Sequence, residues 1–332
     1  MIYEYALDPA LVATWHDRRK YLFFEEKFGI ATRRFVSIYP KKTKWQRMIW
    51  EAFESSEYAE DQNAKLNLSA LIGKLTEDAV KRRSTFSEIP SWIERTEKEH
   101  SIRPFWAILT SVPGRNHLDV IEARCLIENG HDKWTVPGLP TVRRRAAEVA
   151  DLIAPVLRAC RHAIFVDPYF DPCEPRFLRP FKAMIEKMYE YRDDPGEVSV
   201  ELHISIEGFF KSAYSAPRTE ENEKLKCVEL TASFKEKLCG IIPAGGRIKF
   251  VVWKERDYGQ QLHNRYILTD FFGIQFGAGL DEASGRDSET EDDVTCLSRE
   301  QLSVRWKQYG NTNPAFDYAG EPVEILGQKT FN

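Results

Sequence analysis

From residue 142 onward, the pattern of hydrophobic and polar positions alternates between two periods. Three segments with apolar side chains at three- and four-residue spacing are predicted helices: 142–160, 177–191 and 223–239. Five short apolar runs are predicted strands: 163–169, 198–206, 248–253, 262–269 and 273–276. Helices that alternate with strands over short connections indicate an α/β domain, and here they predict a mixed, largely parallel sheet flanked by helices.

The first part of the chain, residues 1–135, has a less regular pattern. Segments 45–53 and 70–83 follow helical spacing, whereas 104–110 and 117–127 are strand-like. We therefore predict a mixed α/β N-terminal domain, and the sequence leaves its fold and its role open.

A boundary between the two parts is predicted at residues 136–141, where two prolines and a glycine precede a helical run. The second domain then covers 142–332. Within it, residues 281–293 hold seven acids against one arginine, so this segment is predicted to be a solvated loop.

Composition and charge narrow the possible functions. The chain has 332 residues, with 47 Lys+Arg against 51 Asp+Glu and a net charge of −4, which excludes a globally basic nucleic-acid coat. The longest stretch without a charged residue or histidine, 104–114, is far shorter than the ~20 apolar residues of a membrane span. Acids at Glu4 and Asp8 and the lack of a basic n-region argue against a signal peptide, so we expect a cytoplasmic protein.

The six cysteines give no sign of a metal or disulfide framework, because no two of them lie within ten residues of each other. We expect reduced thiols, no cofactor and no metal site.

One specific motif lies in the sequence LHNRYILTDFFGIQFGAGLD. His263 and Arg265 are two residues apart on a predicted strand, so their side chains should emerge on the same face. Asp270 follows where the strand should end, and Gly277 comes after six further residues. The chain has seven histidines, and the chance that one of them heads this spacing at random is about 0.004.

This spacing, His-x-Arg-x4-Asp-x6-Gly, resembles the phospholipase D superfamily signature His-x-Lys-x4-Asp-x6-Gly-Ser-x-Asn. The resemblance covers about residues 142–282. It implies a phospholipase D-like domain in which one histidine attacks phosphorus and a second protonates the leaving oxygen, without a metal ion. It implies that His263 is the nucleophile or acid, that Arg265 clamps the phosphate, and that Asp270 orients an imidazole.

The family builds one site from two such motifs, and this chain contains one. The resemblance therefore implies a homodimer that places two copies of His263 across one phosphate, or a subunit of a larger complex. The motif also departs from the family pattern: Arg265 replaces lysine, and the tail reads Gly-Ala-Gly-Leu without the serine and the asparagine. Asp281 and Glu282 follow, and their carboxylates could enter the site but would repel a phosphate.

Two functions follow from the resemblance. One is a metal-independent phosphodiesterase, a nuclease acting on nucleic acid through a phospho-histidine, by analogy with bacterial nucleases of anti-phage (antiviral) defence. The alternative is a catalytically degenerate scaffold or a nucleic-acid-binding subunit of a larger complex. No lipid anchor or amphipathic basic helix is visible, so we expect no membrane partner.

Further substrate contacts are expected outside the motif. Tyr169 follows a predicted strand at a position where α/β sites form, and Gly277 ends the motif. Residues 33–50 hold six basic residues, no acid and four aromatic residues, so Arg34, Lys42 and Lys44 are candidate contacts to nucleic acid, DNA more than RNA. The alternative for 33–50 is a solvated loop that leads into a helix whose tryptophans belong to the core.

Overall fold

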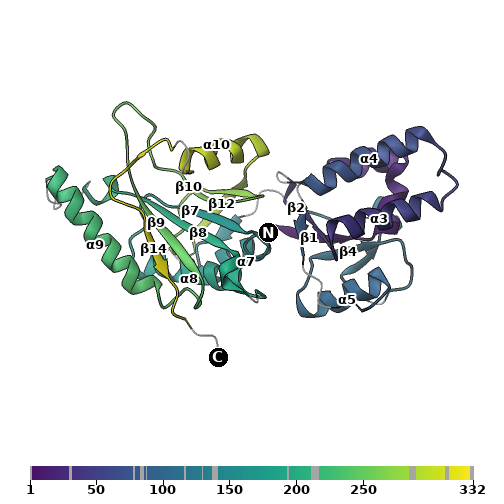
Figure 1. Ribbon diagram of the computed structural model, residues 1–332, viewed down its shortest axis with the longest axis horizontal. Coiled ribbons are helices and arrows are strands. Elements are labelled where there is room, and N and C mark those ends of the chain that lie inside the picture. Colours follow the sequence, from purple (N-terminus) through teal and green to yellow (C-terminus); the bar gives the residue numbers. More distant parts are fainter. Residues whose placement is uncertain are drawn as a thin grey trace. The chain divides into compact units, whose positions relative to one another are not determined.

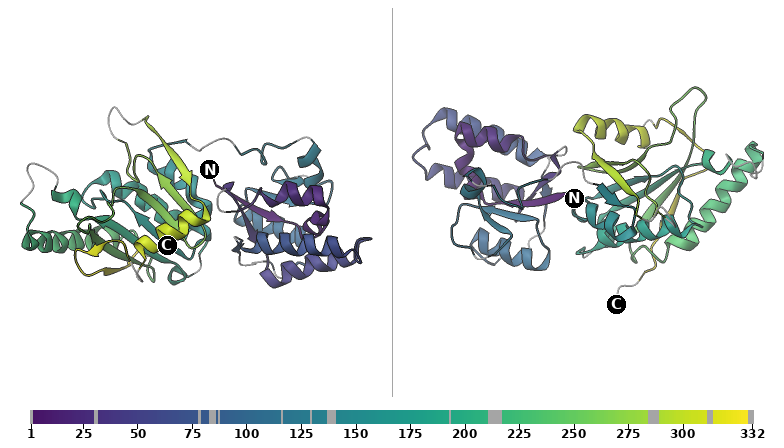
Figure 2. Two further views of the ribbon diagram at one scale, coloured as in Figure 1. Left: turned by 90° about the horizontal axis from the view of Figure 1, so that it is seen from above. Right: turned by 180° about the vertical axis from the view of Figure 1, so that it is seen from behind.

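The computed structural model divides the chain into two compact units, residues 2–138 and 139–332 (Figures 1 and 2). The structure describes residues 2–29, 32–77, 79–82, 86, 88–115, 117–128, 130–136, 141–192, 194–210, 217–283, 289–310 and 314–329. None of the helices within these ranges is long and apolar enough to cross a membrane.

The N-terminal unit is built on a sheet whose five described strands are all parallel, in the order β3-β2-β1-β4-β5. The strands are β1 (Tyr3–Leu7), β2 (Arg34–Ile38), β3 (Val80–Lys81), β4 (Ala107–Thr110) and β5 (Val120–Glu122). The helices are α1 (Pro9–Ala13), α2 (Arg18–Glu25), α3 (Lys42–Glu54), α4 (Gln62–Glu77), α5 (Trp92–Ile102) and α6 (Ala123–Glu128). The predicted α/β character of this part is confirmed.

Alternation along β1 explains how helices cover both faces of this sheet (Figure 1). Tyr5 and Leu7 face a core that includes Trp45 of α3 and Leu68 of α4, whereas Ala6 packs in a second cluster with Trp92 of α5. Burial on both faces is the usual condition of an all-parallel sheet.

Two element predictions in this unit were wrong in part. The segment 70–83 is not one helix, because α4 ends at Glu77 and Val80–Lys81 pair with β2. The segment 117–127 is strand only at Val120–Glu122 and then becomes α6. In both places long-range strand pairing outweighs local propensity.

The C-terminal unit is a mixed α/β layer structure in which α7, α8 and α9 lie on one side of a sheet and α10 on the other (Figure 1). Its helices are α7 (Ala146–Ala159), α8 (Pro175–Tyr189), α9 (Glu220–Leu238) and α10 (Arg299–Tyr309). Its strands are β6 (Thr141–Arg143), β7 (His162–Val166), β8 (Ser199–Ser205), β9 (Arg247–Lys254), β10 (Arg265–Thr269), β11 (Gly273–Phe276), β12 (Glu291–Cys296), β13 (Asp317–Tyr318) and β14 (Val323–Leu326).

The sheet order is β13-β9-β8-β7-β10-β11-β12-β6, with β14 also paired to β9. The predicted mixed sheet with flanking helices is confirmed, but the prediction that it is largely parallel was wrong. Only β7, β8 and β9 pair in parallel, while the other described pairs are antiparallel. Tight turns such as the one between β10 and β11 leave no room for the crossover that a parallel pair requires.

Several element boundaries also differ from the prediction. The helix predicted at 142–160 begins at Ala146, because Thr141–Arg143 pair with β12. The strand predicted at 262–269 begins at Arg265. Of the predicted acidic loop 281–293, residues 284–288 lie outside the described residues, and 291–293 belong to β12.

Candidate functional site

The carboxyl ends of β7 and β11 and the amino end of β10 meet at one edge of the C-terminal sheet. Tyr266 pairs with Val166, so Arg265 lies beside Asp167, the residue that follows β7. On the other side Arg265 pairs with Phe276, which places Gly277 next to Asn264. Strand register therefore gathers Tyr169, His263, Arg265 and Gly277 around one edge.

His263 and Arg265 are the chemically distinctive residues of this edge. His263 is exposed, and its imidazole makes no hydrogen bond within the described part of the chain. The Arg265 guanidinium has a buried Nε with no hydrogen-bond partner, and no ion pair of Arg265 is found among the described residues. A half-buried guanidinium that keeps an unsatisfied N–H donor is well suited to bind a phosphate.

The expected direction of the two side chains rested on a strand that contains both residues. In the structure β10 begins at Arg265, so His263 lies two residues before the strand and the predicted strand position of His263 was wrong. Strand alternation therefore does not set the direction of its imidazole. Its exposure leaves the ring accessible to a ligand.

Tyr169 packs against the cation of this edge. Its ring centroid lies 4.8 Å from Cζ of Arg265, a cation–π contact, and 39% of the residue remains exposed. The tyrosine therefore helps to position the guanidinium.

Asp167, the residue after β7, is buried at this edge. The sequence analysis did not include it among the candidate site residues. Its carboxylate accepts hydrogen bonds from the backbone N–H groups of Tyr169 (3.0 Å) and Leu280 (3.1 Å). Burial raises the pKa of Asp167 to about 6, although these hydrogen bonds and the nearby Arg265 lower it in part. The signal in the sequence was its position at the end of a buried strand.

Gly277 begins a loop whose backbone is held by carboxylates. A side chain on Gly277 would place its Cβ 2.8 Å from Oδ1 of Asp292, and that same oxygen accepts the N–H of Ala278 at 2.9 Å. The glycine is thus required by the close approach of Asp292, a structural reason for its place in the motif.

The two acids that follow this loop are already neutralised. Asp281 pairs with Arg144 and with Arg176 (3.3 Å), and Glu282 pairs with Arg179 (3.4 Å). Their repulsion of a phosphate is therefore smaller than the sequence suggests.

Asp270 does not belong to this edge. It follows the other end of β10, about 17 Å of strand away, and its Oδ1 accepts the backbone N–H groups of Arg161 (3.0 Å) and His162 (3.4 Å). Within one chain Asp270 therefore lies far from His263 and holds the turn that precedes β7, so the expected orientation of an imidazole by Asp270 stays a prediction.

The candidate contacts in the N-terminal unit separate into two groups. Arg34 begins β2, donates to the carbonyl of Trp134 at 2.5 Å and lies over its ring, so its guanidinium serves the fold. Lys42 and Lys44 lie at the opposite edge of the sheet, at the start of α3, and both are exposed. The structure does not bring Arg34 together with these lysines.

The aromatic residues between them are mostly core. Phe35, Tyr39 and Trp45 are buried, and Nε1 of Trp45 donates to the carbonyl of Leu7 at 2.8 Å. The alternative of a solvated loop that leads into a helix with core tryptophans is confirmed for the helix and Trp45, but the loop was wrong, because 34–38 form the largely buried strand β2. The buried rings cannot stack on bases.

A buried polar network that the sequence did not predict lies beneath α10. Glu201 accepts from Nε2 of both His162 and His203 at 3.0 Å, and Nδ1 of His203 accepts from Nε1 of Trp253 at 3.0 Å. Burial disfavours ionisation of Glu201, but the two histidines and Lys249 more than offset it, so its pKa lies well below the usual value. Burial lowers the pKa of His203. Because its Nδ1 accepts the hydrogen bond from Trp253, the hydrogen that His203 shares with Glu201 lies on Nε2.

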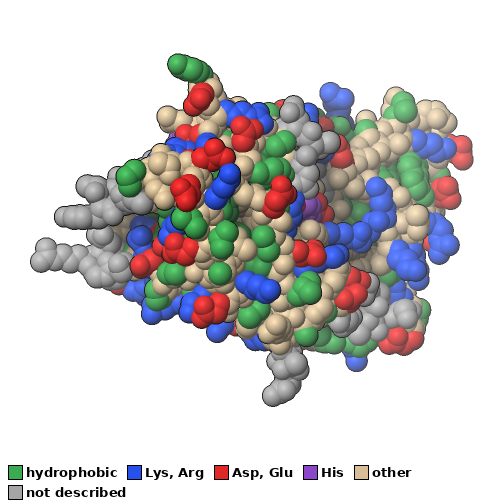
Figure 3. All heavy atoms as spheres, turned by 60° about the vertical axis from the view of Figure 1, so that its left-hand side comes forward, with side chains coloured by type: hydrophobic (Ala, Val, Ile, Leu, Met, Phe, Trp, Pro, Cys, Tyr) green, Lys and Arg blue, Asp and Glu red, His purple; other side chains and the backbone are tan. Residues whose placement is uncertain are grey.

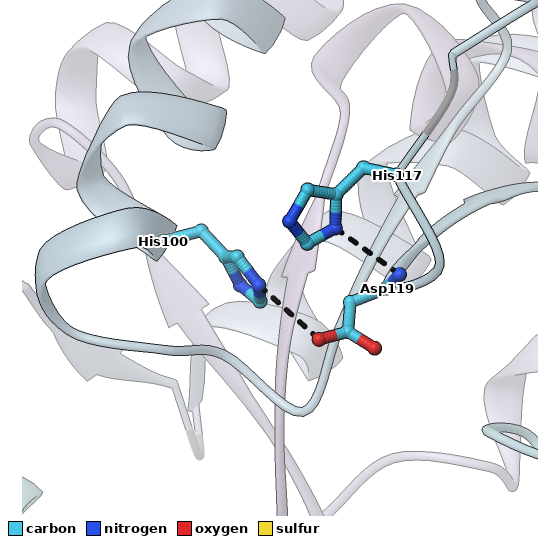
Figure 4. A group of neighbouring side chains, drawn as sticks. All are labelled: His100, His117 and Asp119. Atoms are coloured by element: carbon cyan, nitrogen blue, oxygen red, sulfur yellow. Dashed lines mark hydrogen bonds and ion pairs between the residues drawn. The ribbon is translucent and has the colours of Figure 1, made fainter.

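One cluster of potential metal ligands is found in the described part of the N-terminal unit, where spacing alone gave no hint of it. The ligand atoms of His100, His117 and Asp119 lie within 4.8 Å of one another (Figure 4). However, Nδ1 of His100 accepts the N–H of Phe105 at 3.2 Å, and Nδ1 of His117 accepts the N–H of Asp119 at 3.2 Å. Each Nε2 then carries the hydrogen, so neither ring offers a lone pair to a metal in this arrangement.

Asp119 in this cluster is also occupied. Its Oδ2 lies 3.2 Å from Nε2 of His100, and its Oδ1 pairs with Lys133 at 2.9 Å. The cluster ties α5 to the segment before β5, which is a structural role.

Comparisons with known proteins give no family for the chain. No protein-family model matches it, and no curated protein matches it. Among solved structures, a similarity is found to TrmBL2, an archaeal chromatin protein whose structure shows a novel mode of DNA binding. The two chains are 9% identical, the match covers 76% of this chain and 68% of that chain, and the TM-score is 0.24, which is too low to support a conclusion about fold or function.

Proposed function

We propose that residues 142–332 form a phospholipase D-like domain and that the protein is a metal-independent phosphodiesterase of the nuclease type. The observation that carries this proposal is the position, at one sheet edge, of the exposed His263 two residues from Arg265, whose guanidinium keeps a buried Nε without a hydrogen-bond acceptor. The first group is a nucleophile and the second a phosphate clamp.

The proposed reaction has two displacements. An imidazole nitrogen of His263 attacks phosphorus, the bond to the leaving oxygen breaks, and the protonated His263 of a second protomer gives that oxygen its proton. Water then attacks the phospho-histidine, the second imidazole takes a proton from it, and the phosphorus–nitrogen bond breaks. Arg265 neutralises the charge that builds on the non-bridging oxygens.

A two-fold homodimer is part of this proposal. One chain supplies one such motif, and a two-fold axis brings the same surface of two protomers together. The exposure of His263 is compatible with this arrangement, because an occluded imidazole could not meet its copy across a phosphate.

The choice of nucleic acid as the substrate, with DNA preferred, and a role in antiviral defence rest on the resemblance of the motif. On the face in Figure 3, acidic and basic side chains are interspersed, so binding would depend on a few local cations instead of a uniform field.

A degenerate binding module is the second candidate, and the loop after β11 favours it. Asp292 and Asp167 accept the N–H groups of Ala278 and Leu280, so carboxylates occupy donors next to the place where the family carries its Ser and Asn. This module would bind a phosphate or a partner without turnover.

An assay of cleavage of single- and double-stranded DNA and RNA in the presence of EDTA distinguishes the phosphodiesterase from the binding module. We expect His263→Ala to reduce the rate at least 1,000-fold, because it removes the nucleophile, while His117→Ala, an exposed histidine of the other unit, retains it. If the purified wild-type protein cleaves none of these substrates, the phosphodiesterase proposal is wrong and the binding module is favoured.

A further inference from the structure

The loop between β9 and β10 leads directly to His263 and presents an unusual tyrosine. Tyr258 is fully exposed, at 108% of the reference surface, and its φ of +58° lies in the left-handed region. This region is uncommon for residues with a side chain and costs on the order of 1 kcal/mol for a bulky residue. The ring buries no surface that would offset this cost.

The turn that carries Tyr258 is firmly held. The N–H of Gly259 donates to the carbonyl of Arg256 at 2.9 Å, which closes a four-residue turn with Tyr258 at its third position. Arg256 pairs with Asp317 at 2.8 Å. A type II turn has a positive φ at its third position and favours glycine there, so neither the fold nor the turn accounts for the tyrosine.

The two ends of the same loop are anchored as well. Oε1 of Glu255 accepts the N–H of Leu262 at 2.8 Å, and Oε1 of Glu207 accepts the N–H of Glu255 at 3.0 Å. The loop therefore holds Tyr258 in a fixed position. Five residues separate Tyr258 from His263, so their Cα atoms are at most about 17 Å apart.

A polar cavity of about 590 Å³ adjoins Tyr258. Its cations are committed to carboxylates: Arg218 pairs with Glu207 (2.7 Å) and Glu223 (2.5 Å), and Lys254 pairs with Glu223 (2.7 Å). Such a lining does not favour a phosphate, but the exposed carboxylate of Asp257, which also lines the cavity, can accept a hydrogen bond from the amino group of a nucleobase.

From these observations we propose that Tyr258 and the adjoining cavity form a nucleobase subsite, in which the tyrosine ring stacks on an unpaired base of a single-stranded nucleic acid. That this subsite lies next to a bound phosphodiester rests on the proposed function of His263 and Arg265. Aromatic stacking requires a base that is free of its partner strand, so the subsite selects single strands over duplexes.

The test uses the full-length chain with His263→Ala, to prevent turnover, and fluorescence anisotropy with two labelled oligonucleotides of equal length, one of mixed sequence and one abasic. We expect the abasic strand to bind about tenfold more weakly. Tyr258→Gly should lower the affinity for the mixed strand to the abasic level, leave the abasic affinity unchanged, and keep or raise the Tm. Tyr258→Trp should retain binding.

Tyr191→Gly is the matched control, because Tyr191 is also exposed with a positive φ of +65° but follows α8. It should change neither affinity. Equal binding of mixed and abasic strands, an equal loss for both strands in Tyr258→Gly, or no loss at all would each overturn the subsite.

Failure of the two proposals can be told apart by measuring cleavage by the wild-type chain. If base-dependent binding through Tyr258 is found without any cleavage, the subsite stands and the phosphodiesterase is wrong. If cleavage occurs and Tyr258→Gly has the wild-type KM for single strands, the subsite is wrong and the phosphodiesterase stands.

Discussion

At the scale of single residues, the candidate site owes its character to groups that lack a partner or lie in an unfavourable environment. Arg265 has a buried Nε without an acceptor, and Asp167 is a buried carboxyl group beside it. Leaving such groups in a fold costs stability, and perturbed groups of this kind concentrate at functional sites.

The pH dependence of Asp167 follows from the sign of its shift. Its pKa is about 6 in the folded chain against about 3.8 when unfolded, so the stability it contributes is complete below about pH 4 and is lost as the pH rises to about 6. Asp167→Asn removes this term. We expect its free energy of unfolding, relative to wild type, to rise by about 2 kcal/mol between pH 4 and pH 7. Urea unfolding at several pH values measures this, and a difference that does not vary with pH would contradict it.

At the scale of elements, pairing and burial decided more than propensity. The helix α9 begins at Glu220, three residues before the predicted start, because Thr219 caps it and three acids in its first turn interact favourably with the helix dipole. The network beneath α10 links β7, β8 and β9 through Glu201.

Glu201 is expected to be a principal source of stability in this layer. Glu201→Gln replaces one acceptor oxygen by a donor, which faces an N–H of His162 or His203. We expect a loss of about 3 kcal/mol in the free energy of unfolding of the C-terminal unit. Hydrogen exchange read out by mass spectrometry localises the effect, and Glu236→Gln on the exposed face of α9 is the control. A variant as stable as wild type would show that the network is not stabilising.

At the scale of the whole molecule, two units with separate cores carry different candidate contacts. The chain has a net charge of −4, so binding of nucleic acid must depend on local cations. In the N-terminal unit, Lys42 and Lys44 remain the sequence-predicted candidates, since both are exposed at the start of α3.

Charge reversal tests these lysines. We expect Lys42→Glu with Lys44→Glu to weaken binding of single-stranded DNA and to reduce the slope of log K against log salt by about 1.4 or more, the value for two lost phosphate contacts. Lys98→Glu on α5, also exposed, is the control. Titrations at several salt concentrations measure the slope, and an unchanged slope would remove Lys42 and Lys44 from the interface.

By itself, the sequence determined the elements whose pattern is local. β11 lies at 273–276 as predicted, and β8, β9 and α8 lie within two residues of their predicted ends, because burial of one face imposes a period that can be read directly.

The tertiary structure alone decided which residues meet. Strand register placed Arg265 beside Asp167 and moved Asp270 to the far end of β10. Packing of the N-terminal unit lets Arg34 donate a hydrogen bond to the carbonyl of Trp134. It also brings His100 close to His117 and Asp119. These contacts join residues far apart in the chain, and a local pattern carries no information about such pairings, because they depend on how whole elements pack.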